Sequence, residues 1–200
     1  DRTRRNRPRV LVIEDLLPVG AFGSGFVRSH EIVQTLLREQ CHVTVLALHR
    51  KPLKDELEPG RLLTGAEVLY LDEVPGGLLG LLERRRDALD AIWVCRTLNA
   101  QRLSTALRTV KMWTIPPRTI LDTEALASTR ECALASVFGD GRWSDQLLDS
   151  ALRSELAPGE WFDVVVTVNE HESTLAEKFL PQLEHHVLWH GLKPRHAPHG

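Results

Sequence analysis

The chain has 200 residues, of which 42% are hydrophobic and 26% charged, a composition typical of a soluble globular protein. Its 25 basic and 27 acidic residues leave a formal net charge of -2, which excludes bulk attraction to a polyanion, so we expect no nucleic-acid partner. Three cysteines without close pairing argue against a disulfide framework and predict a reducing, cytoplasmic location.

The first part of the chain predicts a βαβ unit. Val10–Ile13 is a short β-branched run, as in a strand buried on both faces of a parallel sheet. A glycine-containing loop follows, then helical spacing of apolar residues over 27–37, then a second β-branched run over 43–48. Parallel pairing of the two strands with a right-handed crossover is therefore expected.

Strands and helices continue to alternate along the rest of the chain. We predict strands at 67–71, 91–95, 119–121, 163–168 and 187–189, and helices at 78–89, 98–110, 125–138, 144–156 and from 169 to about 179. Ser144 and Asn169 are the expected caps of the last two helices. This alternation predicts an α/β fold, a doubly wound, mostly parallel, Rossmann-like sheet with helices on both faces.

The predicted strand-to-helix loop at 20–25 is the first candidate binding segment, because ligands of open parallel sheets bind beyond the carboxyl ends of the strands. Gly23, Ser24 and Gly25 could point backbone amides at an anionic or sugar group, or they could simply form a flexible connection. Their spacing matches neither the dinucleotide fingerprint nor a Walker motif. Arg28, inside the helix, is either a phosphate contact or a residue of a solvated helix face.

Acidic residues follow two later strands. Asp122 and Glu124 come after the strand at 119–121, where carboxylates can accept hydrogen bonds from sugar hydroxyls, although Asp122 could equally cap the next helix. Glu170 follows the strand at 163–168 with the same ambiguity, because acids also suit the first turn of a helix. The histidines near the end of the chain lack the spacing of metal ligands, so no metal site is expected.

Two further patterns bear on the class of protein. Val12–Asp15 resembles the opening of response-regulator receivers, but the next strands, which end near His49 and Asp72, do not supply a phosphoacceptor in the required order. No run approaches the ~18 apolar residues that a membrane span needs, while arginine runs at 2–9 and 84–86 leave contact with a membrane surface open.

The order of the motifs resembles the N-terminal domain of GT-B type glycosyltransferases of the group 1, retaining family. The matching segments are 9–15 with the glycine loop at 23–25, 41–45 with Cys41 where glycine is usual, 120–126, 163–172, and 187–194 at the crossing between domains. The resemblance implies that residues 1–192 form the acceptor-side domain and that 193–200 begin a linker to a donor-binding domain absent from this chain.

The resemblance also implies the chemistry. A sugar would pass from a nucleotide-sugar donor, bound mainly by the absent domain, to a glycan or lipid-linked acceptor in surface polysaccharide synthesis. No cofactor or metal is expected, and this half alone is expected to be inactive. Acceptor or substrate contacts would come from Gly23, Ser24, Gly25, Arg28, Asp122, Glu124 and Glu170. No catalytic residue is identified. The alternative is a non-catalytic Rossmann-like binding or assembly module.

Overall fold

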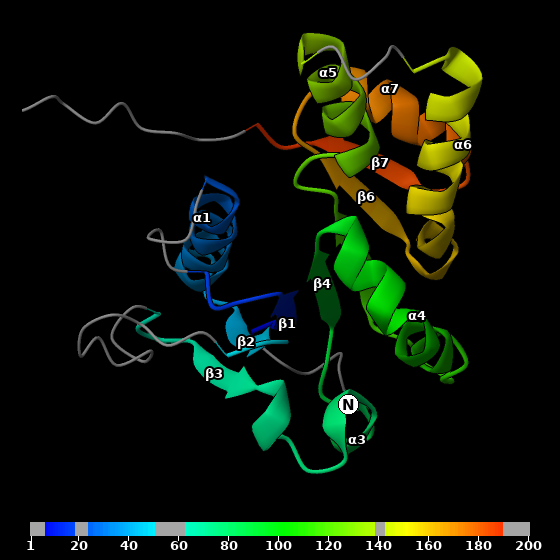
Figure 1. The fold of residues 1–200 in the computed structure, drawn as a ribbon. Helices are drawn as coiled ribbons and strands as arrows, with labels where there is room; N and C mark the ends of the chain where they lie inside the picture. Colours follow the sequence, from blue (N-terminus) through cyan, green and yellow to red (C-terminus); the bar gives the residue numbers. More distant parts are fainter. Residues whose placement is uncertain (1–6, 19–23, 51–62, 139–142, 190–200) are drawn as a thin grey trace, which may run out of the picture.

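The computed structural model describes residues 7–18, 24–50, 63–138 and 143–189, and shows a seven-stranded sheet flanked by helices (Figure 1). The strand order is β3-β2-β1-β4-β5-β6-β7, and every neighbouring pair is parallel. The predicted doubly wound α/β fold is therefore confirmed. The strands are β1 (Arg9–Glu14), β2 (His42–Ala47), β3 (Glu67–Tyr70), β4 (Ala91–Cys95), β5 (Arg118–Asp122), β6 (Val164–Thr167) and β7 (Glu184–Val187).

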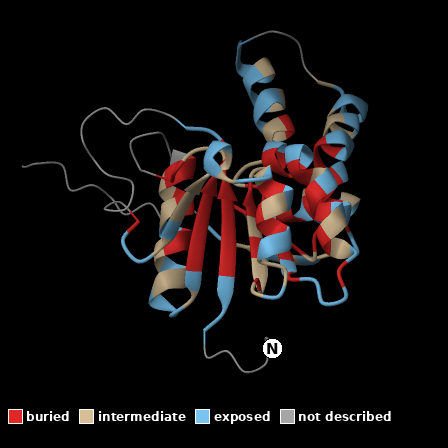
Figure 2. Ribbon diagram, turned by 90° about the horizontal axis from the view of Figure 1, so that it is seen from below, coloured by how far each residue is buried: buried red, intermediate tan, exposed pale blue. Residues whose placement is uncertain are grey.

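Helices cover both faces of the sheet, as the alternating pattern predicts. They are α1 (Ser24–Arg38), α3 (Gly77–Arg84), α4 (Thr97–Lys111), α5 (Ala127–Phe138), α6 (Asp145–Leu156) and α7 (Glu170–Phe179), with short 3-10 helices η3 (Leu71–Glu73) and η4 (Ala157–Trp161). Because side chains alternate along a strand, Val12 packs with Val33 of α1 on one face, whereas Ile13 belongs to the core on the other face, with Leu107 of α4. Buried residues run along the central strands in Figure 2.

The predicted caps of the last two helices are confirmed. The side chain of Ser144 accepts a hydrogen bond from the backbone N–H of Leu147, and that of Asn169 accepts one from Glu172. Each cap satisfies a backbone donor that the first turn of a helix leaves without an intrahelical partner. These two helix starts were therefore encoded locally.

Three predicted boundaries are wrong. The last strand, predicted at 187–189, is β7 at Glu184–Val187, because this edge strand carries polar residues that give no apolar run. The helix predicted at 78–89 ends at Arg84, after which a turn brings the N–H of Asp90 to the carbonyl of Arg9. The helix predicted from 125 starts at Ala127 because Glu124 adopts a left-handed backbone conformation, with φ of 60°.

The reversal of strand order lies between β1 and β4. From β1 the chain passes through α1 to β2 on one side, and from β4 it passes through α4 to β5 on the other. The two connections therefore diverge at the carboxyl ends of β1 and β4, which is where open α/β sheets bind ligands. Among the described residues, no helix is long and apolar enough to cross a membrane.

Candidate functional site

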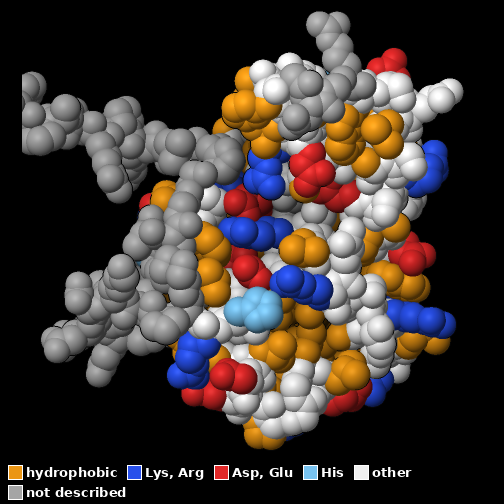
Figure 3. Space-filling model, viewed as in Figure 1, with side chains coloured by type: hydrophobic (Ala, Val, Ile, Leu, Met, Phe, Trp, Pro, Cys, Tyr) orange, Lys and Arg blue, Asp and Glu red, His pale blue; other side chains and the backbone are white. Residues whose placement is uncertain are grey.

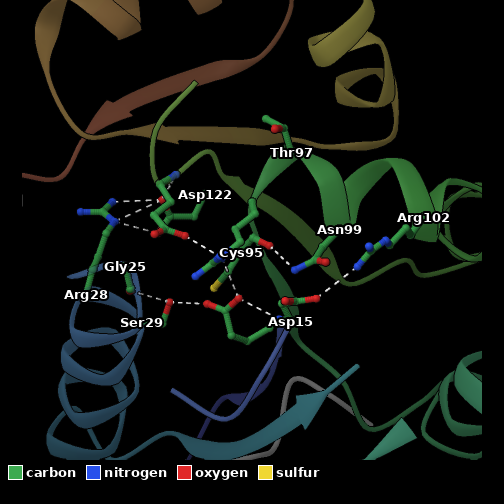
Figure 4. A network of polar contacts seen from close by, with 12 residues as sticks. Asp15, Gly25, Arg28, Ser29, Cys95, Thr97, Asn99, Arg102 and Asp122 are labelled. Atoms are coloured by element: carbon green, nitrogen blue, oxygen red, sulfur yellow. Dashed lines mark hydrogen bonds and ion pairs between the residues drawn. The ribbon is translucent and has the colours of Figure 1, made fainter. Parts of the chain in front are cut away.

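Charged side chains from four elements meet at the carboxyl edge of the sheet, around the reversal of strand order (Figure 4). Glu14 ends β1, Arg96 follows β4, Asp122 ends β5, and Arg28 approaches from α1. Because parallel strands all end at this edge, groups distant in sequence converge there. The result is a layer of ion pairs directly beyond the central strands.

Arg28 and Asp122 form a buried ion pair. Nη2 of Arg28 lies 3.1 Å from Oδ1 of Asp122, and the two side chains are only 3% and 2% exposed. Nε of Arg28 donates to both carboxylate oxygens at 3.3 Å, and Nη1 donates to the carbonyl of Leu188 after β7. Arg28 is therefore not on a solvated helix face, and Asp122 does not cap α5: the pair ties α1 to the ends of β5 and β7.

Glu14 is a fully buried carboxyl group at the end of β1. Its Oε2 accepts a hydrogen bond from the hydroxyl of Ser29 at 2.5 Å, and its Oε1 accepts one from the backbone N–H of Asp15 at 2.7 Å. Burial raises the pKa of Glu14 to about 7, against the opposing effect of the Arg96 guanidinium. Glu14 therefore changes charge near neutral pH without contact with solvent.

Arg96 links two carboxylates. Its Nε lies 3.1 Å from Oε1 of Glu14 and 2.7 Å from Oε2 of Glu124, and its guanidinium stacks 4.3 Å from the ring centroid of Phe26. The backbone of Arg96 has a φ of 76°, a conformation that is costly for a residue with a side chain. Its N–H donates to the carbonyl of Asp122 at 2.7 Å, which holds the strained residue in place.

Glu124 packs its carboxylate against the first turn of α1. A Cβ atom added to Gly25 would lie 1.3 Å from Oε1 of Glu124, so a side chain at this position requires the Glu124 carboxylate to move. Burial is also the main cause that raises the pKa of Glu124, again opposed by Arg96. The negative carboxylate is thus placed at the positive end of the α1 dipole.

Solvent-accessible charged groups lie beside this layer. Nη1 of Arg102, in α4, is 3.1 Å from Oδ1 of Asp15, and Nε2 of His49 is 3.6 Å from the same oxygen. The side chains of Asp15, Arg102 and His49 are 30%, 45% and 59% exposed. Figure 3 shows basic and acidic side chains next to a histidine in the middle of this face. We refer to Asp15, Arg102 and His49 as the exposed triad.

Another buried carboxylate, that of Glu155, connects helices next to the site. Oε1 of Glu155, in α6, accepts hydrogen bonds from the hydroxyl of Thr97 and the N–H of Ala127, at 2.7 and 2.8 Å. Its Oε2 accepts from the N–H and the hydroxyl of Ser128, at 2.9 and 2.6 Å. One side chain therefore connects the first turn of α4 to the first turn of α5.

The structure brings together four of the residues singled out in the sequence, namely Gly25, Arg28, Asp122 and Glu124. Glu170 is exposed in the first turn of α7, and it is Glu172, two residues on, that is buried and accepts from the N–H of Leu126. Ser24 is the first residue of α1. Gly23 and the expected linker at 193–200 lie outside the described residues.

Sequence reasoning missed the residues that complete the site, Glu14, Arg96, Arg102 and His49. The available signal was position, since Glu14 and Arg96 lie at the carboxyl ends of strands that the sequence did predict. A charged residue directly after a buried strand is a candidate for this edge. No group of three or more potential metal ligands occurs among the described residues.

No protein-family model matches the chain, and no curated protein matches it. Solved structures with the same fold include a ugt transferase from Siraitia grosvenorii in complex with UDP, with a TM-score of 0.51 and 11% sequence identity. The match covers 89% of this chain and 50% of that transferase, so the chain spans about half the length of its structural neighbour. At this level of identity the similarity establishes the fold alone.

Proposed function

We propose that the protein is the acceptor-side domain of a GT-B type glycosyltransferase. In this proposal a sugar passes from a nucleotide-sugar donor, held mainly by a second domain, to a glycan or lipid-linked acceptor in surface polysaccharide synthesis. The fold shared with a transferase that binds UDP supports the general class. The retaining mechanism, the cytoplasmic location and contact with a membrane surface follow from the sequence resemblance and pattern, and they belong to the same proposal.

The observation that carries the proposal is the exposed triad at the reversal of strand order. Asp15, Arg102 and His49 are accessible at the edge where doubly wound sheets bind ligands. The Asp15 carboxylate accepts hydrogen bonds from acceptor hydroxyls, and the Arg102 guanidinium contacts an anionic group of donor or acceptor. The imidazole of His49, whose Nε2 is 3.3 Å from Nη1 of Arg102, would exchange a proton with that hydroxyl.

The buried ion pairs have a positioning role in this proposal. Arg28 and Asp122 are inaccessible and satisfy each other, so they fix the ends of α1 and β5 rather than bind substrate. Arg96, held by Glu14 and Glu124, fixes the start of α4, the helix that carries Arg102. The rigid layer thereby holds the exposed triad in one geometry, as a binding site requires.

The test is a transfer assay on the complete gene product with radiolabelled UDP-, GDP- and ADP-hexoses and with glycan and lipid-linked acceptors. Asp15→Asn and Arg102→Gln should each lower kcat/KM at least about tenfold, since each removes a charge-assisted hydrogen bond. Arg108→Gln, an exposed change farther along α4, is the matched control. Absence of transfer and hydrolysis with every donor, or equal activity in all three variants, contradicts the proposal.

A non-catalytic binding module is the second candidate. It is supported by the mutual pairing of the charged groups at the site, since Arg28 and Arg96 are both held by carboxylates of the chain itself. The same site would then bind a nucleotide sugar or glycan without turnover. Calorimetric binding of these ligands by a complete gene product that neither hydrolyses nor transfers the sugar distinguishes this candidate from the enzyme.

A further inference from the structure

A polar cavity lies at the opposite edge of the sheet from the candidate site. Its volume is about 510 Å³ and it is lined by residues at the starts of β1, β2 and β3 and around the C-terminal end of α3. That volume is within the usual range of about 300–1,000 Å³ for small-molecule sites. The site described above involves the ends of the strands, so this cavity is separate from it.

The lining of this cavity is basic. Arg9, Arg84 and Arg85 contribute three guanidinium groups, His42 lies at the start of β2, and Glu67 is the one carboxylate among the described lining residues. At neutral pH, with His42 uncharged, the lining has two more positive than negative charges. The cavity therefore favours an anionic ligand.

Glu67 is already fully engaged. Its Oε2 and Oε1 accept hydrogen bonds from Nη1 and Nη2 of Arg85 at 2.6 and 2.7 Å, and its Oε2 also accepts from the hydroxyl of Thr44 at 2.7 Å. The Glu67 carboxylate thus neutralises the charge of Arg85 through a bidentate ion pair. It forms no such pair with Arg9 or Arg84.

Among the described residues, no carboxylate forms an ion pair with the side chain of Arg9 or of Arg84. The guanidinium of Arg84 donates to the carbonyl of Pro75 at 2.8 Å, which positions it without cancelling its charge. The neighbouring carboxylate of Asp90 accepts instead from the backbone N–H of Arg9 at 2.8 Å.

We propose that this cavity binds a small phosphate monoester through Arg9 and Arg84. Such a group carries a charge of about -1.5 to -2 at pH 7, which matches these two cations, and guanidinium groups pair with phosphate oxygens in a bidentate manner. Val10, Val43 and Leu89 are also among the lining residues, and the carbon skeleton of the ligand would lie beside them. A monocarboxylate would leave one cation uncompensated.

The test is calorimetric titration of the complete gene product at low salt with glucose 1-phosphate and inorganic phosphate as probes. Saturable binding is expected, weakened about tenfold by Arg9→Gln and by Arg84→Gln, because each removes one charge-assisted contact. Glu67→Gln should strengthen binding about threefold, since it removes the one negative charge of the lining. Arg108→Gln is the control and should bind as the unmodified protein does.

Two results would overturn the proposal. The first is the absence of binding of both soluble probes, or equal binding by the Arg9→Gln, Arg84→Gln and Arg108→Gln proteins. The second is binding to vesicles that contain phosphatidic acid but not to the soluble esters, which would make this edge a membrane contact instead of a small-molecule site. Both arginines are exposed, so the variants are expected to fold, and thermal unfolding checks this.

Discussion

Arg28 in α1 and Asp122 at the end of β5 are 94 residues apart in sequence, yet they form an ion pair that is almost fully buried. Nη2 of Arg28 is 3.1 Å from Oδ1 of Asp122, which also accepts the backbone N–H of Glu124 at 3.0 Å. The pair is part of the layer of ion pairs at the candidate site. Substitution of only one of the two residues would leave the other as a buried charge without a partner.

Breaking this pair should therefore be costly. We expect Arg28→Met or Asp122→Ala to lower the free energy of unfolding by about 3–5 kcal/mol, because each leaves an uncompensated buried charge. The double variant Arg28→Met/Asp122→Ala should lose less than the sum of the two single effects. Urea denaturation of all four proteins gives the coupling energy. Additive effects would show that the two side chains do not depend on each other.

A side chain at Gly25 should destabilise the protein while Glu124 is present. Gly25→Ala places a methyl group on the Glu124 carboxylate, so we expect a loss of about 1–3 kcal/mol in the free energy of unfolding. In a Glu124→Gly background the clash is absent and the strained backbone at 124 is relieved, so the same change should cost little. An equal cost of Gly25→Ala in both backgrounds, measured by denaturation, would disprove the contact.

Glu14 should make stability depend on pH near neutrality. Its pKa is about 7 in the folded protein against an ordinary value of 4.5, because burial disfavours the charged carboxylate. The stabilisation from the neutral form is therefore complete below pH 4.5 and is lost as the pH rises through 7. The shift of the pKa from 4.5 to about 7 corresponds to a loss of about 3 kcal/mol in the free energy of unfolding between low and high pH.

Glu14→Gln isolates this effect. The amide oxygen can accept from the Asp15 N–H, and the amide does not ionise. In the structure the Ser29 hydroxyl donates to Oε2 of Glu14, so in the variant this hydroxyl has to reorient to accept from the amide NH2 group. Denaturation curves from pH 5 to 8 should show that the variant gains stability relative to the unmodified protein as the pH rises. A constant difference over this range would show that Glu14 is already charged at pH 5. The charged or titratable neighbours of residue 14, namely Arg96, Glu124 and Cys95, are the same in the unmodified protein and in the Glu14→Gln variant, so the comparison isolates Glu14.

Glu155 should stabilise the first turns of α4 and α5, beside the site. Glu155→Ala leaves the donors of Thr97, Ala127 and Ser128 without their acceptor, so we expect at least about 3 kcal/mol of destabilisation. Hydrogen exchange should accelerate first in α5, whose initial N–H groups this carboxylate binds. Glu170→Ala, at an exposed acid in the first turn of α7, is the control and should cost below about 1 kcal/mol. Equal exchange in α5 in both variants would contradict the capping role.

Much of the fold was encoded locally. The β-branched runs predicted the central strands, since buried parallel strands have a continuous apolar sequence, and Ser144 and Asn169 marked two helix starts through hydrogen bonds that span only three residues. The position of strand β7 was not predicted correctly, because this edge strand consists largely of glutamate and histidine and has no continuous apolar sequence.

The site was decided by the tertiary structure. The sequence by itself determined that Asp122 and Glu124 follow a strand, and that Gly25 and Arg28 lie in the loop and helix that follow the first strand, because this comes from local pattern and from the alternation of strands and helices. It did not determine which charges pair or which face solvent. Those outcomes depend on the order of strands in the sheet, which brings Arg28 to Asp122 across 94 residues and buries Glu14 while it leaves Asp15, the next residue, accessible.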